Sequence, residues 1–137
     1  MARGFYLADA TVAANRIIGN AGNGVGVHGS SGEFGDTAAT VSDNRIERSG
    51  GDGVLVEGQG VVALVERNQS NRNSDDGIDV DFGSYTPDCC FEITARANKA
   101  YFNVDLGIEA APGTTDGGSN KAKHNGNPAQ CVGISCK

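Results

Sequence analysis

The sequence predicts an all-β solenoid of about five coils, in which the strands of each coil stack in parallel on those of the next. Three observations predict it. A block of residues recurs along the 137-residue chain, apolar residues keep fixed positions inside each block, and the composition contains 21 glycines and no tryptophan. Valine, isoleucine, asparagine and glycine dominate, and these residues favour strands and tight turns over helices.

The repeated block consists of an asparagine, a second asparagine or a serine five residues later, and then a glycine. The first asparagines are Asn15, Asn44, Asn68, Asn98 and Asn120, so the block recurs after 29, 24, 30 and 22 residues. In the first four blocks the glycine stands nine residues after the first asparagine, and in the fifth a four-residue insertion delays it. Such repeats are typical of solenoids, in which each unit buries its apolar face against its neighbours.

Apolar residues occupy three columns when the blocks are aligned. One column follows the glycine, and a second lies two residues further on, which on a strand is the same face. A third column lies upstream of each first asparagine. The columns contain Val25, Val54, Ile78, Ile108 and Ile134, then Val27, Val56, Val80, Ala110 and Cys136, and upstream Val12, Val41, Val65 and Ala95. They predict parallel, in-register strands about 4.8 Å apart.

The glycine and the asparagines of the block carry expectations of their own. We expect the glycine to occupy a turn with positive φ, which glycine adopts without steric penalty. We expect the asparagines to tolerate the left-handed conformation and to stack their side-chain amides in a hydrogen-bonded ladder.

This pattern resembles the right-handed parallel β-helix families, namely pectate-lyase-like proteins and the "N…GI" repeats of NosD-like and other secreted or periplasmic bacterial proteins. The resemblance covers Gly4 to Cys136 and implies a single-stranded right-handed parallel β-helix. Residues 4–7 match only the second half of a block, so we expect residues 1–137 to be one domain, a fragment or truncated form of a longer β-helix. The alternative is a Ca²⁺-binding β-roll, but "GGDGVLVEG" matches its nine-residue motif only once.

Composition argues against several classes of protein. A net charge of −6 disfavours a nucleic-acid-binding protein, for which a basic surface is expected. No run approaches 18 apolar residues, so no membrane-spanning segment is predicted, and no signal peptide is recognisable in "MARGFYLADA". Cys131 and Cys136 are a candidate disulfide that would fix the last coil. Oxidised cysteines would point to a secreted or periplasmic protein.

The stretch "NSDDGIDVD" supplies the candidate site. Asp76 precedes the block glycine and is interpreted as a turn residue. Asp79 and Asp81 alternate with apolar residues and should point outward together. The alignment brings His28, Glu57 and Glu109 onto the same face. Glu57, Asp79 and Asp81 would suit Ca²⁺, or paired carboxylates would suit acid–base chemistry on a sugar. The alternative is a solvated acidic face.

The lengths of the loops between blocks predict where a ligand would bind. The stretches 29–39 and 82–93 are long and the stretch between them is short, so we expect two ridges beside a notch. Its floor would carry Glu57, and its walls would carry His28, Glu33, Asp81 and Tyr85. A basic column directly follows the first asparagines, namely Arg16, Arg45, Gln69, Lys99 and Lys121. It would suit an acidic polysaccharide, or it is a charged face that balances the acidic one.

These observations favour a non-catalytic β-helix module, structural or carbohydrate-associated, over an enzyme. The alternative is a polysaccharide lyase, glycoside hydrolase or epimerase with its site in the notch between 29–39 and 82–93. The polygalacturonase set Asn-Thr-Asp, Gly-His-Gly and Arg-Ile-Lys is absent, as is the Asp-Pro-His-Glu motif of alginate epimerases. We also expect a homodimer through the N-terminal coil edge near Phe5, Leu7 and Val12, because that edge would expose backbone groups and apolar columns.

Overall fold

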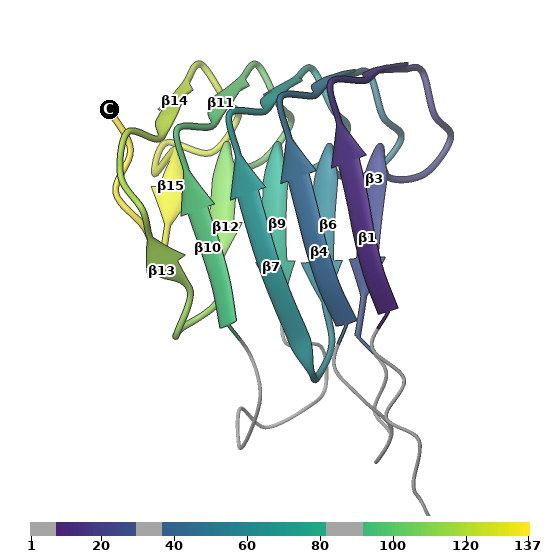
Figure 1. Ribbon diagram of the computed structural model, residues 1–137. Coiled ribbons are helices and arrows are strands. Elements are labelled where there is room, and N and C mark those ends of the chain that lie inside the picture. The colour runs from purple at the N-terminus through teal and green to yellow at the C-terminus, as the bar shows by residue number, and fades with distance from the viewer. Residues whose placement is uncertain (1–7, 30–36, 82–91) are drawn as a thin grey trace, which may run out of the picture.

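The computed structural model describes residues 8–29, 37–81 and 92–137 as a solenoid of three parallel sheets with five strands each (Figure 1). Sheet A contains β1 (Ala8–Ala13), β4 (Thr37–Ser42), β7 (Val61–Glu66), β10 (Glu92–Arg96) and β13 (Thr115–Asp116). Sheet B contains β2 (Arg16–Ile18), β5 (Arg45–Glu47), β8 (Gln69–Asn71), β11 (Lys99–Tyr101) and β14 (Lys121–Lys123). Sheet C contains β3 (Val25–His28), β6 (Val54–Glu57), β9 (Ile78–Asp81), β12 (Ile108–Ala110) and β15 (Cys131–Val132).

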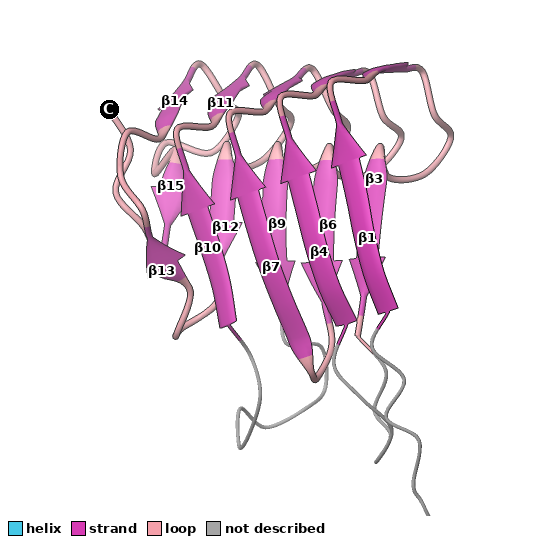
Figure 2. Cartoon of the chain, in the orientation of Figure 1, coloured by secondary structure: helices cyan, strands magenta, loops and turns pink. Residues whose placement is uncertain are grey.

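The predicted parallel β-helix of about five coils is therefore confirmed. The described residues contain strands and loops and no helix (Figure 2), and hence no helix that could cross a membrane. Each coil contributes one strand to every sheet, and equivalent strands pair in parallel with their counterparts in the next coil.

The predicted apolar columns stack in register along the core. Val41 lies opposite Val65 in sheet A, and Val54 lies opposite Ile78 in sheet C. Side chains at these positions are fully buried, so each coil uses its neighbours to exclude water from its apolar face. The register differs from the prediction in the fifth coil. There Cys131, and not Ile134, lies opposite Ile108.

Two ladders of side-chain amides run along the solenoid, as expected. The first ladder runs through Asn15, Asn44, Asn68, Asn98 and Asn120. From Asn44 onward, the Oδ1 of each asparagine accepts hydrogen bonds from the backbone N and the Nδ2 of the asparagine one coil earlier. The second ladder repeats this geometry through Asn73, Asn103 and Asn125. Ser49 interrupts the second ladder, because its buried Oγ has no hydrogen-bond partner. The ladders satisfy polar groups that would otherwise be buried without partners.

The turn conformations correct two expectations. Neither the asparagines nor the glycines of the first four blocks have positive φ. Positive φ instead recurs at the residue immediately before each ladder position. These residues are Ala14, Asp43, Arg67, Ala97 and Ser119 at one corner and Gly19, Arg48, Arg72, Phe102 and His124 at the other. The block glycines are required by close packing. A Cβ on Gly77 would lie 2.5 Å from the carbonyl oxygen of Gly107 and 2.7 Å from the Cβ of Ala100.

The C-terminal end of the solenoid is closed by side chains of the last coil. The Oε1 of Gln130 accepts hydrogen bonds from the backbone N and the Nδ2 of Asn125, both at 3.0 Å, and so takes the place of a further ladder asparagine. Cys131 and Cys136 form a disulfide, the pair that the sequence singled out. The four-residue insertion in the fifth block explains why Cys131, and not Ile134, lies opposite Ile108. Gln130 takes the next ladder position, and the chain enters sheet C directly after it, at Cys131.

Candidate functional site

The outward face of sheet C carries a strip of acidic side chains. Asp79 lies opposite Glu109 of the next coil, and Asp81 lies opposite Glu57 of the preceding coil. His28 stands next to Glu57 in the same column. The five described residues of the predicted site therefore share one face, as the alternation of the strands indicated. Tyr85, Glu33 and most of the stretches that would form the notch fall outside the described residues.

His28 and Glu57 are in direct contact on this face. The Nδ1 of His28 lies 2.8 Å from the Oε1 of Glu57, and their side chains are 60% and 39% exposed. A pair this accessible to water is screened and contributes little to stability. Glu57 therefore remains accessible to solvent although it contacts His28.

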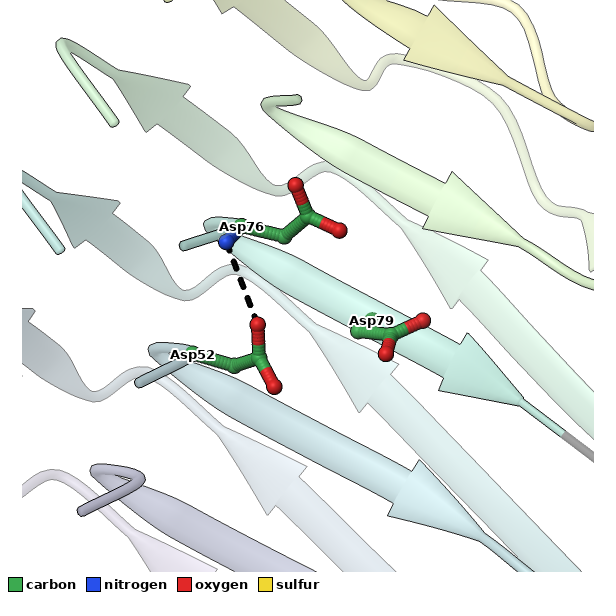
Figure 3. Close-up of side chains that lie close together, drawn as sticks. All are labelled: Asp52, Asp76 and Asp79. Atoms are coloured by element: carbon green, nitrogen blue, oxygen red, sulfur yellow. Dashed lines mark hydrogen bonds between the residues drawn. The ribbon is translucent and has the colours of Figure 1, made fainter. Parts of the chain in front are cut away.

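A trio of carboxylates converges at the N-terminal ends of strands β6 and β9 in sheet C (Figure 3). Asp52 and Asp76 stand in the turns before β6 and β9, and Asp79 lies within β9. One oxygen of each carboxylate lies within 4.8 Å of the others. The backbone N of Asp76 donates to the Oδ1 of Asp52 at 3.1 Å, and the backbone N of Leu106 donates to the Oδ1 of Asp76 at 2.6 Å. Asp76 is therefore a turn residue, as the sequence indicated, and its carboxylate also belongs to this cluster.

Burial raises the pKa of all three carboxyl groups in this trio of Asp52, Asp76 and Asp79. Loss of solvent is the largest cause, and it raises the pKa of Asp76 to about 7 and that of Asp79 to about 7. The pKa of Asp52 is raised for the same reason. Negative neighbours, including Asp75 and Glu109, raise the pKa values further because they disfavour another negative charge.

The trio is suited to sharing protons or to holding a hard cation with oxygen ligands. The sequence predicted Glu57, Asp79 and Asp81 for Ca²⁺, whereas the structure brings Asp79 together with Asp52 and Asp76. Side chains two residues apart on a strand are separated by roughly 6.6 Å, but equivalent positions on adjacent coils are only about 4.8 Å apart. Asp52 and Asp76 occupy the same column before the block glycine, and the sequence interpretation assigned this column to turns and not to the candidate site.

The outward face of sheet B carries the opposite charge. The predicted basic column begins each strand of this sheet, and all five of its side chains are exposed, namely Arg16, Arg45, Gln69, Lys99 and Lys121. Lys123 lies on the same strand and face as Lys121. The only carboxylate that the strands of sheet B contribute is Glu47, whose Oε1 accepts a 2.9 Å hydrogen bond from the Nε of Arg45.

A cationic and aromatic stack borders this basic face at the corner between sheets B and C. The guanidinium carbon of Arg72 lies 5.4 Å from the ring centroid of Phe102. Phe102 in turn stacks on His124, with centroids 5.2 Å apart and an interplanar angle of 10°. These residues belong to the left-handed corner column, which the sequence interpretation did not identify. The sequence does contain a signal for this column, because Arg72, Phe102 and His124 each immediately precede an asparagine of the second ladder.

The comparison with protein families agrees with this geometry. A family model described as the right-handed β-helix region matches residues 3–136. The chain belongs to the right-handed β-helix family. No curated protein and no solved structure gives a significant match to the chain. Membership of this family determines the fold and not the function. The function of this β-helix must therefore be inferred from the side chains on the outward faces of its three sheets.

The third face of the β-helix, on sheet A, is shallow and less charged. A groove of about 260 Å³ crosses β4, β7 and β10, and its outward lining includes Ala38, Thr40, Val62, Leu64 and Thr94. Asp9 and Glu92 are its acidic lining residues. The three faces of the β-helix are therefore chemically distinct, and the charge is divided between an acidic sheet C and a basic sheet B.

Raising the pH from 5 to 8 should lower the free energy of unfolding of this β-helix by at least about 1 kcal/mol. The pKa values of Asp76 and Asp79 are raised to about 7 from 3.8, so the folded protein binds protons that the unfolded chain has released. This contribution is complete below pH 4 and is lost as the pH rises through 7. Urea unfolding at both pH values measures it.

Single carboxylate variants control this pH experiment. Asp79→Asn should reduce the pH dependence, whereas Glu92→Gln, which changes an exposed carboxylate on sheet A, should preserve it. Adding Ca²⁺ at pH 8 tests whether the trio of Asp52, Asp76 and Asp79 binds a cation as well as protons. A bound cation would restore the free energy of unfolding that is lost when the carboxyl groups ionise. Equal stability of the wild-type protein at pH 5 and pH 8 would show that the trio is not protonated at neutral pH.

Proposed function

We propose that this chain is a non-catalytic β-helix module that associates with an acidic polysaccharide through the outward face of sheet B. The observation that supports it is the exposed basic column, with a cation on four of the five coils, in a protein whose net charge is −6. Successive coils repeat at about 4.8 Å, so a polyanion lying along the solenoid axis meets a cation at almost every coil. Local concentration of one sign of charge favours a ligand of the opposite sign.

The cations nearest the C-terminal end are the most available to such a ligand. Among the described residues, Lys99, Lys121 and Lys123 take part in no ion pair, whereas the guanidinium of Arg45 is held by Glu47. Tyr101 lies between Lys99 and the corner, and its half-buried ring offers an apolar surface beside the charges. Carboxylate or sulfate groups of a polysaccharide would pair with the lysines, and the sugar ring would lie against the aromatic side chain.

The separation of the charges supports a role in binding and not in cleavage. Glycoside hydrolysis uses two carboxyl groups that flank the bond to be broken. Here the converging carboxylates lie on sheet C, while the cations that would hold an acidic glycan lie on sheet B. A polysaccharide bound to sheet B would therefore lie across the corner from the trio of Asp52, Asp76 and Asp79.

Binding to polygalacturonate, measured by calorimetry at low and moderate salt, tests this proposal. Lys99→Gln/Lys121→Gln should weaken binding about tenfold or more and should reduce its dependence on salt. Arg67→Gln/Arg96→Gln removes the same charge from the end of sheet A and the corner that follows it, where both arginines pair with Glu66, and should leave affinity within about twofold.

Three outcomes of this experiment would overturn the proposal. Equal binding to a neutral polysaccharide would remove the electrostatic argument. Equal losses in the two double variants would show that net charge alone, and not sheet B, determines affinity. Release of oligosaccharides from the polymer would show that the module is catalytic. Thermal unfolding of each variant would verify that the fold is retained.

A further inference from the structure

The corner between sheets B and C carries a column of side chains that immediately precede the second ladder. Three of them stack on one another along the solenoid, namely Arg72, Phe102 and His124. The backbone keeps them in register, because the backbone N of Arg72 and that of Phe102 each donate to a carbonyl of the next coil, at 3.1 Å and 3.4 Å. All three residues are exposed, so the stack faces solvent.

Phe102 holds the guanidinium of Arg72 in a defined place. The guanidinium carbon lies 5.4 Å from the ring centroid, and His124 stacks on the ring with centroids 5.2 Å apart. Arg72 belongs to the coil before Phe102 and His124 to the coil after it, so they cover opposite faces of the ring. A cation over an aromatic face is attracted by the ring. A guanidinium stacked in this way keeps its N–H groups free, because they lie in its plane and point outward from its rim.

The N–H groups of Arg72 have no competing partner in the described part of the chain. Among these residues, no carboxylate forms an ion pair with its guanidinium and no hydrogen bond engages it. Glu47, which sheet B contributes, makes its hydrogen bond with Arg45. Asp75 and Asp105 follow the ladder asparagines, on the side of sheet C. Arg72 therefore offers a planar set of donors to an anion from outside.

This corner column and the basic column of sheet B flank a middle column. Three residues along the chain separate the two flanking columns, which corresponds to about 10 Å. The middle column is in register through Asn71, Tyr101 and Lys123. A glycan that lies along the solenoid axis over this column would have Lys99 and Lys121 on one side and Arg72 on the other.

We propose that Arg72 selects a carboxylate-bearing sugar, a uronic acid, within the polysaccharide bound along sheet B, an inference that rests on the proposed function. The coplanar N–H groups of a guanidinium match the two oxygens of a carboxylate and bind it through two parallel hydrogen bonds. The lysines supply charge without this directional requirement. Phe102 is a positioning residue, because it holds the guanidinium at the edge of the middle column.

Arg72→Lys tests this role, because it keeps the charge and removes the planar set of donors. Binding to polygalacturonate, measured by calorimetry, should weaken about tenfold, which is the effect of losing a hydrogen bond between charged groups. Arg48→Lys makes the same exchange one coil earlier in the column and should leave affinity within about twofold. Methyl-esterified polygalacturonate, which lacks the carboxylates, should bind the wild-type and Arg72→Lys proteins equally weakly.

Two substitutions of Phe102 separate positioning from a structural role. Phe102→Leu removes the aromatic face and should weaken binding to polygalacturonate about threefold. Phe102→Tyr keeps the ring and should restore the wild-type affinity. Nuclear magnetic resonance of the wild-type protein gives a measurement that needs no variant. The Nε–H resonance of Arg72 should shift when polygalacturonate is added, and that of Arg48 should shift much less.

The outcomes distinguish this inference from the proposed function. Unchanged affinity in Arg72→Lys, together with the loss expected for Lys99→Gln/Lys121→Gln, would overturn the inference alone. A wild-type protein that does not bind polygalacturonate would overturn both. Equal losses in Arg72→Lys and Arg48→Lys would contradict selection by the stacked guanidinium. If a variant fails to fold, as thermal unfolding would show, an unchanged Arg72 resonance in the wild-type complex still contradicts the contact.

Discussion

Replacing Asn98 with alanine should lower the free energy of unfolding by about 3–5 kcal/mol. The side chain is fully buried, and its Oδ1 accepts hydrogen bonds from the backbone N of Asn68 at 3.0 Å and from the Nδ2 of Asn68 at 3.1 Å. Its Nδ2 donates to the carbonyl of Val65 at 2.8 Å. Truncation would remove these partners of the Asn68 backbone N–H and the Val65 carbonyl, and it would leave the Nδ2 of Asn68 with only its hydrogen bond to the Val41 carbonyl. Each buried group left without a partner costs about 1–3 kcal/mol.

Urea unfolding at constant pH measures this loss, and the same substitution at an exposed ladder position is its control. Asn20 stands at the start of the second ladder, where its Nδ2 makes one exposed 3.4 Å hydrogen bond to the carbonyl of Gly24. Asn20→Ala should change the free energy of unfolding by no more than about 0.5 kcal/mol. Similar effects of the two substitutions would show that the ladder does not stabilise the fold.

The sequence specifies the ladders and the core columns because both depend on identical residues recurring at a fixed spacing. Asn44, Asn68 and Asn98 can be recognised from spacing alone, and so can the stacking of Val54 on Ile78. Charged faces follow from the same alignment, since alternation decides which residues point outward. The acidic face of sheet C and the basic face of sheet B were therefore predictable.

The conformation of the corners was not predictable from residue preferences. Glycine and asparagine are the usual residues at positive φ, but here most left-handed positions hold residues such as Ala14, Arg67 and Phe102. The ladder imposes this conformation, because the turn must bring the next asparagine under its neighbour, and the buried hydrogen bonds outweigh the local strain. The tertiary hydrogen bonds of the ladder, and not the conformational preferences of single residues, therefore determine which corner residues have positive φ.

The trio of Asp52, Asp76 and Asp79 was missed for a related reason. Asp76 and Asp79 are three residues apart, and alternation along one strand does not bring such residues together. They meet because the turn before β9 ends between them and because Asp52 stacks one coil earlier, where its Oδ1 accepts the backbone N–H of Asp76. Distances across coils, and not spacing along the strand, determine which carboxylates share a site.

Gly77→Ala should lower the free energy of unfolding by about 3 kcal/mol or more. The new Cβ would lie 2.5 Å from the carbonyl oxygen of Gly107 and 2.7 Å from both the Cβ of Ala100 and the Nδ2 of Asn103. None of these atoms lies at the end of a long side chain that could move away. Relief would therefore require adjacent coils to separate, which would lengthen the hydrogen bond from the backbone N of Ile78 to the Gly107 carbonyl.

Gly22→Ala is the matched control for this substitution, because a Cβ there would meet no atom within 4 Å and the residue is not left-handed. Its effect should be neutral or stabilising by up to about 1 kcal/mol, since alanine restricts the unfolded chain. Thermal unfolding of both variants measures the difference. If Gly77→Ala were as stable as Gly22→Ala, the coils would tolerate expansion at this corner, and the recurrence of glycine in every block would need a reason other than close packing.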